Sequence, residues 1–284
     1  MRRRDLITVL SAACIVPNRT FAQSQGFKPA VFKQGVTQGV FDPRLSFEEK
    51  CRLAADLGIK GFDLIPPQDW PVLRKYGLTP SMSPQNAGVT IADALNVKEN
   101  HDRIEKTMRA AIDQCAAGGC PNFITFSGNR RGMPDAEGAD NCVAFLNKGK
   151  AQAEDKGVTI CMELLNSKVN HKDYMCDHSK WGVDVVKGVN SPRVKLLFDI
   201  YHMQIMEGDI CRTIRENPQW IGHFHTGGVP GRHEIDDTQE LNYHFVAQTL
   251  ADLGYAGYVS HEYTPAPGRD PKESLKQAIA IMTV

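Results

Sequence analysis

The 284-residue sequence has no excess of charge of either sign, with 33 Lys and Arg residues against 33 Asp and Glu residues. It lacks the basic surplus that sequence-independent nucleic-acid binding requires, so we expect no nucleic-acid partner. It also lacks a run of about 18 apolar residues, so no stable membrane span is expected. Apolar residues make up 42% and charged residues 23% of the chain, which is ordinary globular usage and excludes disordered or fibrous proteins.

Two further kinds of motif are missing. No CxxC pair occurs, so we expect neither a thiolate zinc site nor a thioredoxin-type redox site. Beyond the first 23 residues, seven cysteines remain at irregular spacing, and we expect free thiols that pack as small apolar side chains. Neither GxGxxG nor a GK[ST] ending is present, so no nucleotide cofactor is expected.

The first 23 residues have the three parts of an export signal. Arginines at 2–4 form a basic head, an apolar stretch covers residues 6–16, and residues 20–22 form the exit. The arginine pair in front of Asp5 favours the twin-arginine route. The sequence therefore predicts a bacterial periplasmic or secreted protein whose mature chain, after loss of the basic head, is slightly acidic.

From residue 24 to residue 284, short β-rich stretches alternate with amphipathic helical stretches. Strands are expected at 31–36, 61–65, 78–82, 122–127, 158–163, 194–199, 221–225 and 257–262. Helices are expected at 46–58, 70–76, 99–117, 136–156, 181–189, 209–217, 243–253 and 271–282. Eight such units without a break in composition predict a single α/β domain, a (β/α)8 TIM barrel. The alternative, a doubly wound sheet, usually carries the Gly-rich first turn that is missing here.

Four of the expected strands end on side chains of the kind that bind metal ions. These are Glu163, Asp199, His225 and Glu262, each about one strand–helix unit from the next. Because the carboxyl ends of barrel strands converge on the face that holds active sites, we expect the four to share one centre. Any one of them alone is more simply the start of an exposed loop. Three carboxylates and one imidazole suit a divalent metal ion, Mn²⁺ or Mg²⁺ first, with Co²⁺ and Zn²⁺ as alternatives.

The two glutamates suggest a reaction. Glu163 and Glu262 close the fifth and eighth strands, so they can lie on either side of a bound ligand. A metal ion that holds adjacent oxygens of an α-hydroxy carbonyl compound makes an enediolate easier to form. One glutamate can then remove a proton from carbon while a group on the other side returns it. This is the chemistry of isomerases and epimerases of small hydroxy-carbonyl compounds and sugars.

Several segments resemble the hydroxypyruvate isomerase family. They are FDIYHMQIMEGDI at 198–210, IGHFH at 221–225, PGRHEID at 230–236, and the strand followed by Glu262 and Tyr263. That family belongs to the xylose isomerase-like TIM barrels, which also include the ketose 3-epimerases. The resemblance covers residues 30–284. It implies the same four metal ligands, with Glu163 and Glu262 as the proton-transfer pair, and substrate contacts from His202 and Arg232.

The resemblance has two departures. The hydroxypyruvate isomerases usually carry Gln at the third ligand position, where this chain has His225, as the ketose epimerases do. The family enzymes are also cytoplasmic. From the resemblance we expect an isomerase of the hydroxypyruvate type. Because of the departures, a ketose or keto-sugar 3-epimerase is the alternative. Two further hypotheses are a lyase or hydrolase of oxidised (3-keto) glycosides, and a binding protein that has lost catalysis.

Three other histidines are expected near the site or its supports. In the loop after the fifth strand, His171 is the expected substrate contact, with a solvated loop as the alternative. His223 lies two residues before His225, hence on the same side of its strand, and is expected as a buried support. His261 faces the other way, toward the helices. Barrels of this family often pair, which makes a homodimer the candidate assembly.

Overall fold

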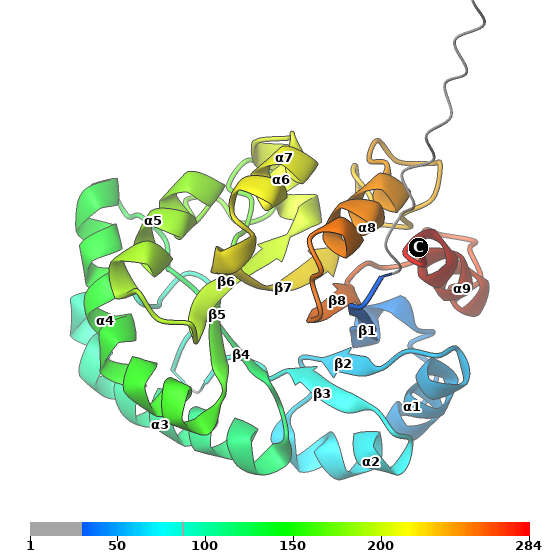
Figure 1. The fold of residues 1–284 in the computed structure, drawn as a ribbon, viewed down its shortest axis with the longest axis horizontal. Coiled ribbons are helices and arrows are strands. Elements are labelled where there is room, and N and C mark those ends of the chain that lie inside the picture. Colours follow the sequence, from blue (N-terminus) through cyan, green and yellow to red (C-terminus); the bar gives the residue numbers. More distant parts are fainter. Residues whose placement is uncertain (1–29, 87) are drawn as a thin grey trace, which may run out of the picture.

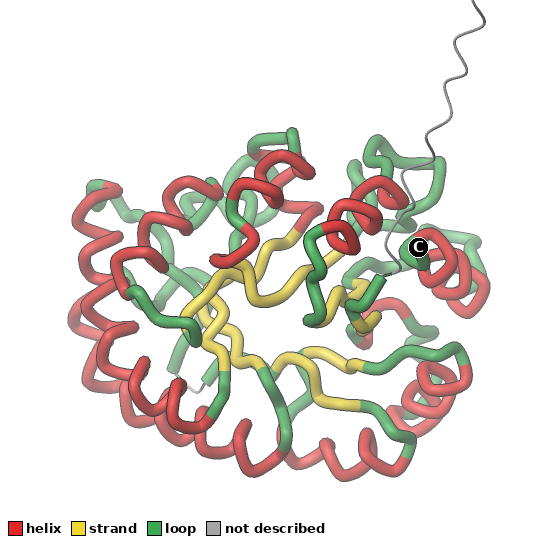
Figure 2. Tube along the Cα trace, in the orientation of Figure 1, coloured by secondary structure: helices red, strands yellow, loops and turns green. Residues whose placement is uncertain are grey.

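The computed structural model of the chain describes residues 30–86 and 88–284. The export signal predicted at 1–23 lies outside these residues and stays a prediction. In the described part, eight parallel strands form an inner ring with α-helices around it (Figures 1 and 2). The strands are β1 (Lys33–Val36), β2 (Gly61–Asp63), β3 (Thr79–Met82), β4 (Asn122–Thr125), β5 (Thr159–Glu163), β6 (Val194–Asp199), β7 (Ile221–Thr226) and β8 (Tyr258–His261).

The strands pair in the order β3-β2-β1-β8-β7-β6-β5-β4, and every pairing is parallel. Sequential strands are neighbours, and the first pairs with the last. Between β3 and β4 the ring is completed by Ser83, whose N–H donates to the carbonyl of Asn122 (2.9 Å) and whose carbonyl accepts from the N–H of Ile124 (3.2 Å). The predicted (β/α)8 barrel is therefore confirmed.

The helices alternate with the strands, as the sequence pattern requires. They are α1 (Phe47–Asp56), α2 (Trp70–Lys75), α3 (His101–Gly118), α4 (Asp135–Lys156), α5 (Ser179–Val189), α6 (Ile200–Met206), α7 (Ile210–Glu216), α8 (Tyr243–Asp252) and α9 (Pro271–Ile281). Helix α1 begins with a capping box, in which Ser46 accepts from the N–H of Glu49 and the Glu49 side chain accepts from the N–H of Ser46. Helices α3 and α4 end where Gly119 and Gly157 adopt the left-handed conformation.

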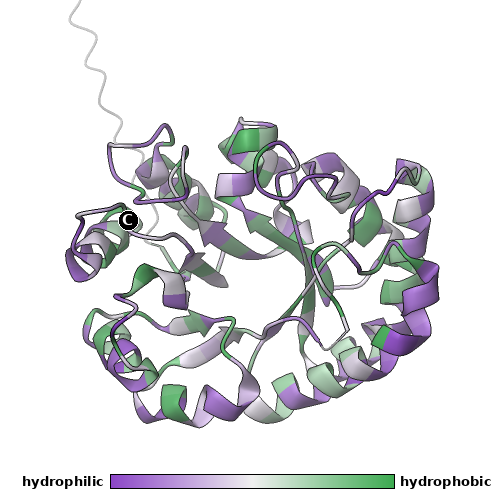
Figure 3. Ribbon diagram, turned by 180° about the vertical axis from the view of Figure 1, so that it is seen from behind, coloured by the Kyte–Doolittle hydropathy of each residue, from purple (hydrophilic) through white to green (hydrophobic). Residues whose placement is uncertain are grey.

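The core lies between the strands and the inner faces of the helices. Strands β4 and β5 are buried along their whole length, and the middle of each is apolar, Phe123 and Ile124 in β4 and residues 160–162 in β5. The view from the opposite side shows green, apolar segments on the inner strands beside hydrophilic ones, and helices of mixed hydropathy around them (Figure 3). The cysteines of the described residues are free, and all except Cys211 are buried. None of the described helices is both long and apolar enough to cross a membrane.

The main difference from the predicted elements lies after β6. We expected a helix only at 209–217, but α6 starts directly at Ile200 and is followed by the separate α7. Asp199 makes this possible because its side chain accepts from the N–H of His202 and so caps α6 while ending the strand. Several strands are also shorter than expected. β2, for example, stops at Asp63, because Leu64 adopts a positive φ of 61°.

His261 lies between β8 and the helix layer, as expected. Its Nε2 donates to Oε1 of Gln34 on β1 (3.0 Å), and its Nδ1 accepts from the hydroxyl of Thr226 (3.0 Å). Because Gln34 Nε2 in turn donates to the carbonyl of Ile279 on α9, the ring is held in one neutral tautomer. Burial lowers the pKa of His261 to about 4.

Because of the low pKa of His261, we expect the free energy of unfolding to decrease as the pH falls. The unfolded chain takes up a proton on His261 below pH of about 6.5, whereas the folded chain does so only near pH 4, so the folded state loses stability as pH falls between these values. Relative to His261→Gln, the wild type should lose about 2 kcal/mol of unfolding free energy between pH 7.5 and pH 5. Urea unfolding of both proteins at each pH measures this, and a difference that stays constant with pH would contradict it.

Candidate metal centre and active site

Four strands deliver the predicted metal-ligand side chains to one place. Glu163 ends β5, Asp199 ends β6, His225 is the penultimate residue of β7, and Glu262 directly follows β8. In the register of the sheet, Asp199 is level with His225, and His225 is level with Ser260, two residues before Glu262. These side chains therefore share the inner face of the barrel at its carboxyl end. Each of the four offers one ligand atom, and these atoms all lie within 4.8 Å of one another.

The imidazole of His225 lies at the middle of this cluster. Its Nδ1 is 2.6 Å from Glu262 Oε2, 3.4 Å from Glu163 Oε1 and 3.8 Å from Asp199 Oδ2. This nitrogen is buried and forms no hydrogen bond of good geometry with any described residue. One imidazole nitrogen and three carboxylate oxygens together form a donor set that suits a hard or borderline divalent cation. The residues present therefore fit a metal ion.

The two glutamates differ in proton affinity in the metal-free protein. Burial, together with the charges of Glu262 and Asp199, raises the pKa of Glu163 to about 7. Burial acts in the same direction on Glu262, but the charges of His225 and Arg232 prevail and lower its pKa to about 2. One carboxyl group can thus carry a proton near neutral pH while the other stays ionised. Such a divided pair is typical of acid–base sites.

Arg232 reaches into the same cluster from the loop after β7. Its Nη2 donates to Asp199 Oδ2 and to Glu262 Oε2, each at 2.6 Å, and its Nε donates to the carbonyl of Glu262 at 3.0 Å. Its guanidinium group also lies over the ring of Tyr201, 4.9 Å from the centroid. Arg232 therefore supplies positive charge where three carboxylates converge.

His202 and His171 lie beside this cluster. His202 is in the first turn of α6, where its Nδ1 accepts from Asn166 Nδ2 (2.6 Å) and its Nε2 is 2.6 Å from Arg232 Nη1. Burial lowers the pKa of His202 to about 3, so the ring is neutral. The half-buried ring of His171 packs edge-on against His202 at 5.2 Å between centroids. The structure thus brings every predicted site residue to one end of the barrel.

A cavity of about 460 Å³ opens onto the two glutamates. Its polar lining comes from Gln85, Glu163, Asn170, His171, His202, Arg232 and Glu262. Its apolar lining comes from Leu64, Ile91, Ile124, Phe126 and Leu165. A volume of this size, with a few converging polar groups on an apolar wall, is typical of sites for small molecules.

The sequence profile described as "Xylose isomerase-like TIM barrel" matches residues 51–283. The chain belongs to this family. Among its curated relatives is the 2-oxo-tetronate isomerase of Pectobacterium atrosepticum, which is 27% identical over 232 residues, 77% of this chain and 87% of the relative. A Drosophila melanogaster protein named as a hydroxypyruvate isomerase is 39% identical over 156 residues, 55% of this chain and 59% of the relative.

A solved structure of another protein has a similar fold. A protein from Brucella melitensis described as an AP endonuclease of family 2 superposes with a TM-score of 0.77, at 25% identity, over 89% of this chain and 98% of its own. The family assignment confirms the resemblance that the DIYHMQIMEGD segment predicted. The curated relatives carry the names of isomerases, as predicted for the enzyme class.

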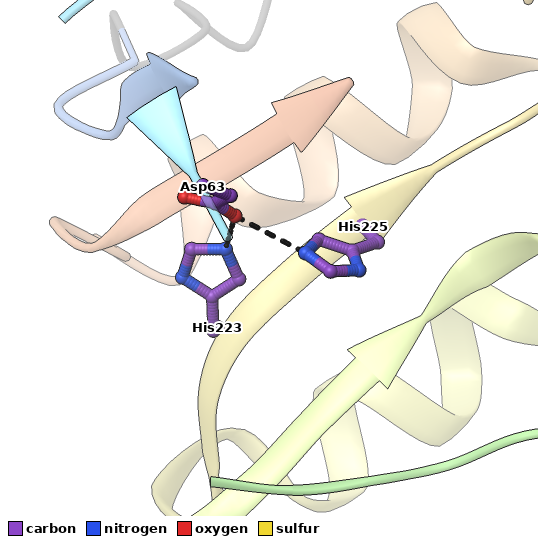
Figure 4. A group of neighbouring side chains, drawn as sticks. All are labelled: Asp63, His223 and His225. Carbon is purple, nitrogen blue, oxygen red and sulfur yellow. Dashed lines mark hydrogen bonds and ion pairs between the residues drawn. The ribbon is translucent and has the colours of Figure 1, made fainter. Parts of the chain in front are cut away.

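One buried side chain of this xylose isomerase-like barrel, that of Asp63, was not predicted from the sequence to belong to the site. Asp63, at the end of β2, is fully buried and lies between two histidines of β7 (Figure 4). Its Oδ2 accepts from His223 Nε2 at 2.6 Å and from His225 Nε2 at 3.1 Å. Burial would raise the pKa of Asp63, but the two histidines hold it well below the usual range. The expected strand at 61–65 contains Asp63 in its middle, and this polar residue within a strand was the only available signal.

Proposed function

We propose that this protein is a divalent-metal-dependent isomerase of small hydroxy-carbonyl compounds, of the hydroxypyruvate isomerase type. The observation that carries the proposal is the convergence of Glu163, Asp199, His225 and Glu262, with ligand atoms within 4.8 Å of one another, beside a cavity for a small molecule. The metal ion expected there is Mn²⁺ or Mg²⁺, because three of the four ligands are carboxylates. When bound, such an ion polarises the carbonyl and hydroxyl oxygens of a substrate.

The protein's own groups move the protons. For hydroxypyruvate, one glutamate of the pair removes a proton from the hydroxyl-bearing carbon C3, and the electron pair forms the C2–C3 double bond of an enediol. The other glutamate returns a proton to C2, while the hydroxyl proton of C3 is transferred to the oxygen of C2, which gives tartronate semialdehyde. Glu163 and Glu262 both line the cavity, from the end of β5 and from the residue after β8, so each can reach a bound substrate.

The charge in the cavity favours a keto acid as substrate. Arg232 is the one Lys or Arg side chain among the described residues that line the cavity, and its guanidinium group can hold a carboxylate through two parallel hydrogen bonds. His202 and His171 then face the remaining oxygens. The names of the curated relatives, 2-oxo-tetronate isomerase and hydroxypyruvate isomerase, support a substrate of this class.

Deuterium exchange tests the proposal directly. The protein, freed of metal with a chelator and reloaded with Mn²⁺, is incubated in D₂O with hydroxypyruvate, with 2-oxo-tetronate and with a panel of ketoses and 3-keto-glycosides, and products are followed by NMR. We expect deuterium at the carbon beside the carbonyl group and an aldehyde product from a keto acid. Activity that survives complete removal of divalent metal would reject the metal-dependent mechanism, and absence of exchange with every compound would reject the isomerase.

A 3-epimerase of ketoses or keto-sugars is the second candidate. The observation that favours it is the third ligand, His225, together with a cavity that has room for a compound longer than a three-carbon acid. In the same experiment an epimerase would introduce deuterium at C3 of a ketose and invert that carbon without moving the carbonyl group. The two candidates therefore give different products from the same panel.

A further inference from the structure

A buried carboxylate, Asp63 on β2, contacts two histidines of β7, one of which belongs to the candidate metal centre. Asp63 on β2 contacts the Nε2 atoms of His223 and His225, and Ser81 on β3 donates its hydroxyl to the second carboxylate oxygen. Asp63 and both rings are completely buried. Figure 4 shows the carboxyl group between the two imidazoles, with His225 presenting one ring nitrogen to it. This arrangement leaves the other nitrogen of His225, Nδ1, for the metal-ligand cluster.

The cluster of Asp63, His223 and His225 also has the residue types of a metal site. Its geometry favours hydrogen bonds over an ion between these groups. Asp63 Oδ2 accepts hydrogen bonds of good geometry from both rings, at 2.6 Å from His223 Nε2 and 3.1 Å from His225 Nε2. His225 Nδ1, on the side of the candidate metal centre, forms no such bond with a described residue. The three residues therefore form a hydrogen-bonded unit and not a second cation site.

The surrounding groups settle which nitrogen of each ring donates to Asp63. The amide nitrogen of Asn122, a donor, is 3.5 Å from Nδ1 of His223, so that nitrogen accepts and Nε2 carries the proton. An ionised carboxylate has only acceptors, so Nε2 of His225 must carry a proton as well. Each ring nitrogen of His225 then has a separate role, Nε2 toward Asp63 and Nδ1 toward the three carboxylates.

We propose that Asp63 is a positioning residue of the metal centre, which accepts the Nε2–H of His225 and so holds Nδ1 directed at Glu163, Asp199 and Glu262. Where it concerns the metal ion, this inference rests on the proposed function; the orientation of the ring belongs to the protein itself. A carboxylate behind a metal-binding histidine fixes the ring and makes it a better ligand, and its loss lowers metal affinity by about 10- to 100-fold.

Three variants separate this role from general packing. Asp63→Leu removes the acceptor at similar volume, and Asp63→Asn keeps an acceptor oxygen but removes the charge. Ser81→Ala is the matched control, because it removes a hydrogen bond to Asp63 and leaves both histidine contacts in place. In calorimetric titrations of the metal-free proteins with Mn²⁺, we expect Asp63→Leu to bind about 10- to 100-fold more weakly, Asp63→Asn to lie between, and Ser81→Ala to stay close to wild type. Equal affinity of Asp63→Leu and Ser81→Ala would overturn the proposal.

A measurement on the wild type decides the matter even if Asp63→Leu does not fold. In the metal-free protein with ¹⁵N-labelled histidine, the Nε2-bound protons of His223 and His225 should exchange slowly with water, and the variants His223→Phe and His225→Phe assign them. A His225 ring that carries its proton only on Nδ1 would overturn the proposal. A wild type that takes up no divalent cation would instead reject the proposed metal-dependent function, while the NMR result still decides the role of Asp63.

Discussion

The variant Glu262→Gln is expected to lower kcat by about 10²- to 10⁴-fold, the range that one general acid or base supplies. Glutamine keeps the size of the side chain but neither takes up nor releases a proton at neutral pH. The same loss is expected for Glu163→Gln, because the enediol mechanism needs one group to remove a proton and another to return it. The substrate should still bind to either variant, since the cavity walls and Arg232 remain.

Metal content has to be measured alongside this activity. Both glutamates are also candidate ligands, so each variant is assayed at saturating Mn²⁺, with its bound metal determined by elemental analysis. Glu240→Gln is the matched control, because Glu240 is an exposed carboxylate on the loop after β7 that bonds only to Gln204 among the interactions described. A metal-loaded Glu163→Gln or Glu262→Gln protein with kcat within tenfold of wild type would reject proton transfer by this pair.

The barrel could be predicted because its signals are local. Each strand–helix unit has its own apolar period and its own end signal, such as the capping box at Ser46 and the left-handed glycine at Gly157. The convergence of four strand ends then follows from the geometry of the fold. Helix α6 was missed because it is short and its cap, Asp199, already counted as the last residue of a strand and as a metal ligand.

The support behind the site could not be predicted in the same way. Asp63 is 160 residues away from His223 in the sequence, and their contact depends on how β2 and β7 face each other across the barrel interior. Nothing in the segment around Asp63 distinguishes a buried anion from the first residue of an exposed loop. The contacts of Arg232 are similar, because a loop of 16 residues leaves its direction open until the barrel is closed.

The second large effect is expected from replacing Arg232, and it concerns the free energy of unfolding. In the metal-free protein its guanidinium group is bound to Asp199 and Glu262, and removing it takes away a positive charge that faces both carboxylates, with Glu163 close by. Removing one partner of a buried ion pair is strongly destabilising, and we expect Arg232→Met to lose about 3 kcal/mol of unfolding free energy in the presence of a chelator at pH 7.5. Urea unfolding, followed by circular dichroism, measures this loss.

The control is an arginine whose ion pair lies in solvent. Arg131 pairs with Asp93 at 3.2 Å, but their side chains are 53% and 41% exposed, so Arg131→Met should lose less than about 1 kcal/mol. The loss in Arg232→Met should shrink as pH falls below about 4.5. Glu262, whose pKa is held at about 2 in the wild type by His225 and Arg232 against the effect of burial, contributes stability above its unfolded pKa that disappears as it takes up a proton.

A bound metal ion should reverse this effect. Arg232 and a cation both neutralise Asp199 and Glu262, so a cation at 100 times its Kd should stabilise Arg232→Met by about 2.7 kcal/mol and bring it close to the metal-free wild type. The wild type should gain less from the same concentration of Mn²⁺, because the ion has to displace the guanidinium group from two carboxylates. A variant that is as stable as wild type in chelator, or one that Mn²⁺ does not stabilise, would show that Arg232 and the metal ion do not share these ligands.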